Sequence, residues 1–200
     1  MEKQQPTLET SRLILRPIRQ DDAFHILALG GDRDVASTTQ LPHPYTEGNA
    51  KDFVEKQAKV YRDGECVNFA ICAKDKRFAD EIGWEPGRLM GVIGFYLNLA
   101  NNRAELGYWL VKPFWGKGIT FESAKAVVEY GFTDVQLNRI YANHVTRNVA
   151  SGQILKKLGM RFEGTSRQHI FRWEHAEDSE NYAILASEWQ QNTIQAMKKA

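Results

Sequence analysis

The spacing of hydrophobic residues predicts helices on either side of a run of strands. After a short strand at residues 13–16, apolar residues follow helical spacing from Asp22 to Gly30, and again from Thr46 to Gly64. The polar segment 32–45 between them, with Pro42 and Pro44, is expected to be an irregular loop. We therefore expect two helices in the N-terminal third, the second capped by Thr46.

The pattern then changes to that of strands. Residues 67–73, 89–99 and 105–111 are rich in β-branched and aromatic residues, and a charged connection, 75–88, separates the first two. Together they predict an antiparallel meander.

The second half of the chain returns to mixed helices and strands. Apolar residues from Thr120 to Phe132 share one helical face, and a strand follows at 139–145. A short helix at 150–158 ends at Gly159, which is expected to take a left-handed conformation. Further strands are expected around 160–162 and 181–186. Because the chain has no repeats or linkers, we expect one domain over residues 1–200.

Two glycines follow the third strand of the meander. Gly116 and Gly118 flank a turn that opens the helix, and glycine lets backbone amides approach a phosphate. The turn fits neither a Walker A loop, which needs a glycine further upstream, nor a dinucleotide fingerprint, whose third glycine is Phe121 here. It indicates a site for a pyrophosphate-bearing cofactor, with a plain structural turn as the alternative.

Composition narrows the classes of function. The 200 residues are 42% hydrophobic and 26% charged, with a net charge of +1, which gives no general reason to expect a nucleic-acid ligand. No apolar run reaches the roughly 20 residues of a membrane span, and the N-terminus lacks the core of a signal peptide. Cys66 and Cys72 suit neither a disulfide framework nor a metal site, so we expect free thiols in a cytoplasmic protein without a metal.

A series of short motifs carries a resemblance to a known family. The motifs are Thr10-Ser11-Arg12-Leu13-Ile14-Leu15-Arg16, Glu105-Leu106-Gly107-Tyr108-Trp109-Leu110, Trp115-Gly116-Lys117-Gly118, Asn138-Arg139-Ile140, Asn148-Val149-Ala150-Ser151, Leu158-Gly159-Met160 and Tyr182-Ala183-Ile184-Leu185. In this order they resemble the GNAT N-acetyltransferases, in the branch of the Rim-type (RimJ/RimL-like) ribosomal-protein N-terminal acetyltransferases. One departure is Pro113, where the family usually has a polar residue with an amide.

The resemblance implies a fold and a reaction. The fold is α/β (α+β), with a mixed, mostly antiparallel twisted sheet of about seven strands, about four helices and a splayed central strand pair. The reaction is direct transfer of an acetyl group from acetyl-CoA to a primary amine, with no metal. The leading acceptor is a protein N-terminal α-amine; a small amine, or a non-catalytic acyl-CoA-binding module, stays open.

The resemblance also implies which residues hold the cofactor. Backbone amides at the glycine turn would bind the pyrophosphate, and those residues are Trp115, Gly116, Lys117, Gly118, Ile119, Thr120 and Phe121. Backbone groups of Leu110 and Val111 would bind the pantetheine arm. Asn148 would also hold the cofactor.

Two residues are candidates for proton transfer. Glu105 is the candidate general base, and a surface ion pair with Arg103 or another cation is the alternative. Ser151 is the candidate acid for the leaving thiolate, while its spacing from Asn148 also fits a helix N-cap with its partner. His144 is expected to be a packed or surface histidine, and Cys66 is not expected to carry the acyl group.

The acceptor side is expected to be formed by residues 32–45, the Trp84 region and residues 167–180. Acidic residues in the last segment, Glu174, Glu177, Asp178 and Glu180, would attract a cationic amine or simply be solvated. A homodimer is common in the family. The sequence does not fix the acceptor, the acyl group or the oligomeric state.

Overall fold

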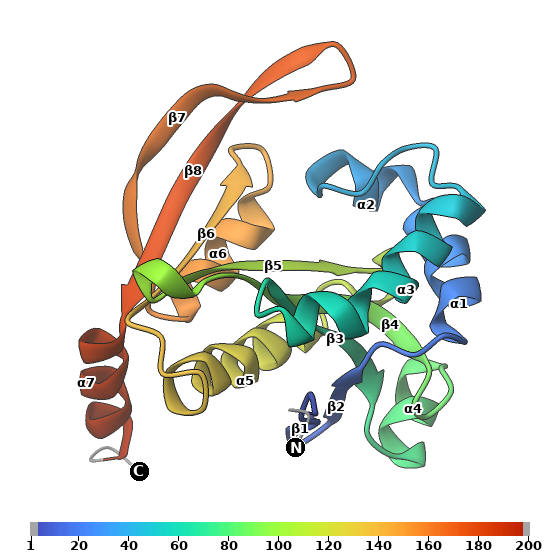
Figure 1. The fold of residues 1–200 in the computed structure, drawn as a ribbon, viewed down its shortest axis with the longest axis horizontal. Coiled ribbons are helices and arrows are strands. Elements are labelled where there is room, and N and C mark those ends of the chain that lie inside the picture. Colours follow the sequence, from blue (N-terminus) through green and yellow to red (C-terminus); the bar gives the residue numbers. More distant parts are fainter. Residues whose placement is uncertain (1–3, 198–200) are drawn as a thin grey trace. The chain divides into compact units, whose positions relative to one another are not determined.

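The computed structural model describes residues 4–197, which divide into two compact units (Figure 1). Of these residues, the first unit takes in 4–97 and 107–127, and the second takes in 98–106 and 128–197. The chain passes from one unit to the other at three places, which lie within the fourth strand, the fifth strand and the fifth helix.

The strands of the first unit follow the order β1-β2-β3-β4-β5. Their bounds are β1 (Leu8–Glu9), β2 (Leu13–Pro17), β3 (Cys66–Ala73), β4 (Leu89–Asn98) and β5 (Arg103–Leu110), of which this unit holds the last part. β1 to β4 pair antiparallel with their neighbours, and the antiparallel pair of β3 and β4 confirms the first two strands of the predicted meander. Leu13, Leu15, Phe69 and Ile71 are fully buried and form part of the core of this unit.

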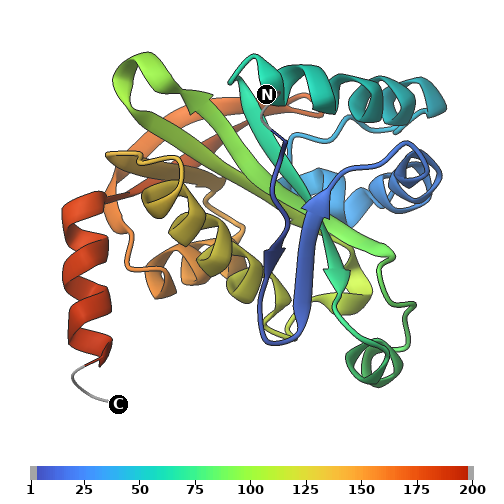
Figure 2. The same cartoon turned by 60° about the horizontal axis from the view of Figure 1, so that its bottom comes forward.

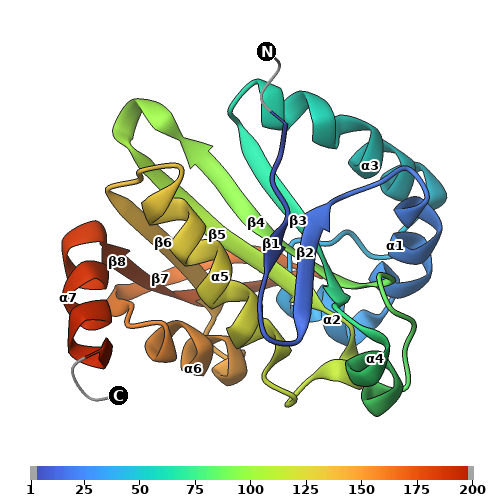
Figure 3. The same cartoon turned by 90° about the horizontal axis from the view of Figure 1, so that it is seen from below.

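Four helices lie before β5 in this unit, within the residues that the structure describes. They are α1 (Asp22–Gly30), α2 (Arg33–Thr38), α3 (Glu47–Arg62) and α4 (Lys76–Ile82). α1 and α3 pack against each other (Figure 3), and α3 also packs on β3 (Figure 2). The predicted cap of α3 is confirmed, since the Thr46 side chain accepts from the Asn49 N–H and the Asn49 side chain accepts in return.

Two of these helices correct the sequence predictions. Residues 32–45 were expected to be an irregular loop, yet they contain α2, which Asp32 caps by accepting from the Asp34 N–H at 2.7 Å. The charged connection at 75–88 contains α4, capped by Asp75 at 2.9 Å from the Phe78 N–H. Each helix is about two turns long and buries only two residues. The sequence therefore has no helical spacing of apolar residues that would predict it.

The strands of the second unit follow the order β5-β6-β8-β7. This unit contains β6 (Arg139–Val145), β7 (Arg161–Arg172) and β8 (His175–Leu185), the first part of β5, the 3₁₀ helix η1 (Leu99–Asn101), the end of α5 (Ile119–Thr133), and the helices α6 (Val149–Lys157) and α7 (Ala186–Met197). β5 and β6 are parallel, and β8 is antiparallel to both β6 and β7. The registered pairing of β5 with β6 covers three residues and ends at Glu105.

The C-terminal third differs most from the prediction. β7 and β8 form a hairpin that is much longer than expected (Figure 1), and the turn at Trp173 and Glu174 has φ of 45° and 70°. The outer part of the hairpin exposes apolar residues, with Phe171 77% exposed, so it has no alternation of buried and exposed residues to detect. α7 was not predicted at all.

The predicted fold class is confirmed: the fold is mixed α/β with mostly antiparallel strand pairs. Residues 4–197 contain eight strands and seven α-helices, where about seven and four were expected. Gly159 has φ of 82°, as predicted for the end of α6. That residues 1–200 form one domain stays a prediction.

Candidate functional site

The glycine turn forms as the sequence predicts. β5 ends at Leu110, the 3₁₀ turn η2 (Lys112–Phe114) follows, and α5 begins at Ile119. Gly116 and Gly118 both have left-handed backbones, with φ of 74° and 76°. A Cβ at Gly116 would meet no atom within 4 Å, so the conformation, and not crowding, is what requires glycine there.

The start of α5 supplies backbone donors. Glu122 donates its N–H to the Gly118 carbonyl at 3.0 Å and closes the first turn of the helix. The N–H groups of Ile119, Thr120 and Phe121 lie within that turn, where helix geometry gives an amide no intrahelical acceptor. These donors and the two left-handed glycines fit a pyrophosphate.

Two of the backbone N–H groups at the predicted cofactor-binding residues already donate hydrogen bonds within the protein. The Trp115 N–H donates to the Lys112 carbonyl at 3.0 Å, and the Val111 N–H donates to the Met90 carbonyl at 3.0 Å. The Trp115 indole donates to the Leu110 carbonyl at 2.6 Å. The Val111 carbonyl accepts from the Phe114 N–H at 3.1 Å, so the carbonyl oxygens of Leu110 and Val111 each accept one hydrogen bond and keep a second lone pair for a ligand.

Pro113 does not disrupt the turn. It occupies the start of η2, where an N–H has no partner in any case, so its missing donor costs little. Phe114, next in the chain, is 2% exposed and packs edge-on against Trp84 at 5.1 Å between ring centroids. Arg88 covers the Trp84 ring at 4.1 Å, so Trp84 supports this turn.

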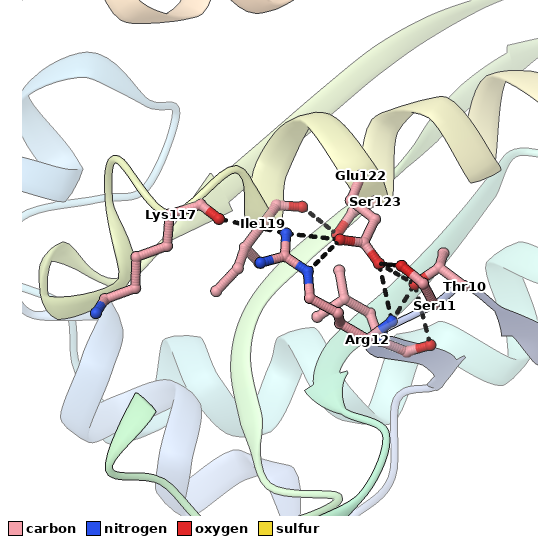
Figure 4. A network of polar contacts seen from close by, with 8 residues as sticks. Thr10, Ser11, Arg12, Lys117, Ile119, Glu122 and Ser123 are labelled. Carbon is pink, nitrogen blue, oxygen red and sulfur yellow. Dashed lines mark hydrogen bonds and ion pairs between the residues drawn. The ribbon is translucent and has the colours of Figure 1, made fainter. Parts of the chain in front are cut away.

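A polar network joins the N-terminal segment to the start of α5 (Figure 4). Glu122, in the first turn of α5, accepts from Thr10, Ser11 and Arg12 at 2.6 to 3.0 Å. Burial acts to raise the pKa of Glu122, but the hydrogen bonds from Thr10 and Arg12 outweigh it and hold that pKa below its ordinary value. No signal in the sequence pairs these segments.

Glu105 lies in the second unit, at the end of the registered pairing with β6. Its Oε1 accepts a hydrogen bond from the Asn143 amide at 2.8 Å. Burial raises the pKa of Glu105, while the Asn143 hydrogen bond and the nearby His169 act against that rise. Arg103, the expected alternative partner, lies instead over the Tyr141 ring, and within residues 4–197 Glu105 has no ion pair with a lysine or arginine.

Asn148 and Ser151 are brought together at the start of α6. The Asn148 side chain accepts from the Ser151 N–H at 3.2 Å, which confirms the N-cap. Ser151 is 8% exposed. The structure thus gives Asn148 a structural role as the cap of α6.

His144 was expected to be either packed in the interior or on the surface, and it is buried. Its Nδ1 lies 2.9 Å from the Val145 carbonyl, and its ring stacks on Tyr182 with centroids 5.6 Å apart. The Tyr182 hydroxyl donates to Glu180 at 2.7 Å, and burial together with this bond raises the pKa of Tyr182 to about 12.

The two thiols are not activated. Cys72 is buried and Cys66 is half-buried, and both are free. Burial raises the pKa of each thiol to about 11, so both are protonated at neutral pH. Within residues 4–197, no cluster of three His, Cys, Asp or Glu side chains has the arrangement of a metal site. No helix in that range is long and apolar enough to cross a membrane.

The acidic residues expected to attract an amine are largely occupied. Glu177 pairs with Arg147 at 2.9 Å, and Asp178 accepts from the Gln168 N–H at 2.7 Å. Glu180 accepts from Tyr182. These contacts weaken the case for this segment as a free cation-attracting surface.

Comparison with known proteins finds the same kind of enzyme at each level of similarity, namely an N-acetyltransferase. The profile of the acetyltransferase (GNAT) domain matches residues 12–161. The uncharacterized N-acetyltransferase YoaA of Bacillus subtilis is 32% identical over 181 residues, which are 90% of this chain and 97% of YoaA. The uS5-alanine N-acetyltransferase of Escherichia coli, which acts on a ribosomal protein, is 30% identical over 84 residues, covering 42% of this chain and 43% of that enzyme.

A solved structure shows the same fold. RimL, a ribosomal α-N-protein acetyltransferase in complex with coenzyme A, superimposes with a TM-score of 0.78 at 19% identity, covering 90% of this chain and 98% of RimL.

Proposed function

This chain is an acetyltransferase that belongs to the GNAT family, and we propose that it transfers an acetyl group from acetyl-CoA directly to a protein N-terminal α-amine. The observation that carries the proposal is the glycine turn before α5, with Gly116 and Gly118 in left-handed conformations. Acetyl-CoA, when bound, supplies an activated thioester.

The cofactor is proposed to be held by the backbone. The N–H groups of residues 116–121 bind the pyrophosphate, which is favoured at a helix N-terminus because the helix dipole is positive there. The carbonyl oxygens of Leu110 and Val111 accept from the pantetheine amides. Asn148 is proposed to contact the cofactor in addition to capping α6.

Proton transfer is assigned to two side chains. Glu105 accepts the proton of the attacking ammonium, directly or through a water molecule, and its raised pKa brings it closer to the pH at which it works. As the neutral amine nitrogen bonds to the thioester carbon and the carbon–sulfur bond breaks, Ser151 gives a proton to the departing thiolate, and the second proton that the nitrogen loses on becoming an amide restores the serine hydroxyl. An α-amine with a pKa near 8 loses its proton more readily than a lysine near 10.4, which favours α-amines as acceptors.

The names of relatives support a ribosomal-protein acceptor. The uS5-alanine enzyme of Escherichia coli matches less than half of this chain, and the similarity to RimL is one of fold. A protein N-terminus is therefore our proposal for this chain, and a homodimer is a further expectation.

Paired peptides test the acceptor class. Each ribosomal-protein N-terminal peptide is prepared with a free α-amine, and again with a formylated α-amine and an internal lysine. We expect acetyl transfer to the free α-amine alone, measured by mass spectrometry. Transfer to the lysine of the blocked peptides, or only to polyamines or amino acids in the same panel, would contradict the proposed acceptor.

A further inference from the structure

The segment Thr10 to Arg12 has no role in the proposed chemistry, yet it contacts the start of α5 and the glycine turn (Figure 4). The Arg12 backbone N–H and the Thr10 and Ser11 hydroxyls all donate to Oε1 of Glu122. The Arg12 Nε donates to Oε2 at 2.7 Å, and Nη2 forms an ion pair with the same oxygen, also at 2.7 Å. One carboxylate thus accepts four hydrogen bonds, one of them from a cation with which it also forms an ion pair, which is far more than an exposed ion pair makes.

The flat face of the Arg12 guanidinium also packs on an aromatic ring. Its guanidinium carbon lies 5.0 Å from the centroid of the Phe78 ring, and Phe78 is 5% exposed. The Glu122 side chain is 16% exposed and that of Arg12 is 37% exposed. Stacking and a forked ion pair together restrict the guanidinium to one position.

From that position Arg12 holds the turn. Its Nη2 donates to the Lys117 carbonyl at 3.3 Å, and it would lie 3.5 Å from a Cβ at Gly118. The Lys117 carbonyl and the Gly118 N–H belong to one planar trans peptide, in which they point in opposite directions. Holding the oxygen toward Arg12 therefore turns the Gly118 N–H away from it. A peptide next to a glycine would otherwise rotate with little cost.

We propose that Arg12 and Glu122 are positioning residues, which hold the Lys117–Gly118 peptide so that its N–H is directed at the cofactor's pyrophosphate. Glu122 fixes the guanidinium, and the guanidinium fixes the peptide. This inference rests on the proposed function, because it concerns an amide assigned to acetyl-CoA. It gives the N-terminal motif a role in donor recognition.

The alternative is that Arg12 binds a phosphate with its own charge, and the two ideas differ in what Glu122 does. If Arg12 bound phosphate itself, Glu122→Gln would release its charge and leave donor affinity unchanged or stronger. If Arg12 positions the peptide, Glu122→Gln loosens the guanidinium and weakens donor binding. Arg12→Gln weakens donor binding in both cases.

The test compares two acetyl donors, acetyl-CoA and S-acetylpantetheine, which lacks the pyrophosphate. For Arg12→Gln and Glu122→Gln we expect kcat/KM with acetyl-CoA to fall about tenfold, the loss for one well-placed hydrogen bond of about 1.4 kcal/mol. We expect kcat/KM with S-acetylpantetheine to stay within about twofold of the wild type. The ratio of the two values does not depend on the fraction of folded enzyme, so loss of stability does not mimic the effect.

Arg139→Gln is the matched control, because Arg139 makes a forked pair with Glu163 that is remote in sequence from the turn. This variant should leave the donor ratio unchanged. The inference is overturned if either turn variant leaves the ratio at the wild-type value, or if Glu122→Gln raises it. Failure of the proposed function looks different, since the wild type would then use neither donor.

Discussion

The Asn143 amide donates to the Glu105 carboxylate at 2.8 Å, across the parallel pair of β5 and β6. The pairing sets Glu105 opposite Tyr141, and Asn143 lies two residues further along β6. Glu105 therefore carries a fixed hydrogen bond in a site that is partly shielded from water. A candidate base held in this way has a defined orientation and a pKa that its surroundings control.

Glu105→Gln tests the assignment of the base. We expect kcat to fall by about 10²- to 10⁴-fold at neutral pH, because a positioned base contributes about that much. The deficit should shrink as pH rises through the pKa of the acceptor amine, near 8, since the amine then loses its proton to solvent. Affinity for coenzyme A, measured calorimetrically, serves as the control and should not change. A deficit that is constant over the whole pH range would count against proton transfer to Glu105.

Asn143→Leu tests the control of that pKa. Burial raises the pKa of Glu105, and the hydrogen bond from Asn143 opposes the rise. Loss of the bond should raise the pKa further, so the acidic limb of the kcat/KM profile should move to higher pH. The profile is measured with saturating peptide and limiting acetyl-CoA. An unmoved limb would mean that a group other than Glu105 sets it.

Gly116→Ala tests the backbone of the turn. The residue has φ of 74°, which costs a non-glycine residue about 1–2 kcal/mol, and open space surrounds it. Relief of that strain would move the amides, so coenzyme A affinity should fall by about tenfold. Gly48→Ala is the control, because Gly48 lies in α3 outside the turn and its nearest neighbour would be 3.7 Å away. Equal affinity of both variants would contradict a role of the turn in binding.

Asp22→Asn tests what stabilises the first unit. Asp22 is 2% exposed and accepts twice from the buried Arg16, at 2.7 Å each, and once from the Arg19 N–H. Removing its charge leaves Arg16 buried without a counter-charge, and the free energy of unfolding should fall by about 3–5 kcal/mol. Asp63→Asn, in the exposed pair with Lys59, should have no measurable effect in the same urea titration. Similar losses for both variants would show that burial of the pair is not what matters.

The stability of the Glu122 network should depend on pH in one direction. The pKa of the Glu122 carboxyl is lowered from the ordinary value of 4.5, so the folded state favours the ionised carboxylate. This contribution is present above pH 4.5 and is lost as pH falls through the lower pKa of the folded protein. The difference in free energy of unfolding between wild type and Glu122→Gln should therefore shrink as the solution is made more acidic over this range. A difference independent of pH would contradict the ion pair with Arg12.

Local chemistry explains which parts of the fold the sequence predicts. Thr46 before α3, the two glycines before α5 and Gly159 after α6 each favour one backbone conformation, and each was located. α2 and α4 were missed because each buries only two residues. The outer part of the β7–β8 hairpin was missed because its residues, such as Phe171, do not alternate between a core and solvent.

In the candidate site too, the sequence predicts some features and misses others. Glu105 and the glycine turn stand out as residues, but their partners do not. Asn143 lies 38 positions from Glu105, and Arg12 lies 110 positions from Glu122, so only the folded chain brings each pair together. Motif order identified the family from the sequence, whereas the contacts that tune the site depend on tertiary structure.

The central claim is catalysis of acetyl transfer to an amine, and release of the coenzyme A thiol measures it most directly. Acetyl-CoA is incubated with the protein, with and without a peptide that has a free α-amine, and thiol release is followed together with the peptide's mass. We predict that thiol release requires the peptide and equals the acetyl groups gained at its N-terminus. Acetyl-CoA that raises the melting temperature but releases no thiol with any peptide or small amine would contradict the account, and would identify the protein as an acyl-CoA-binding module.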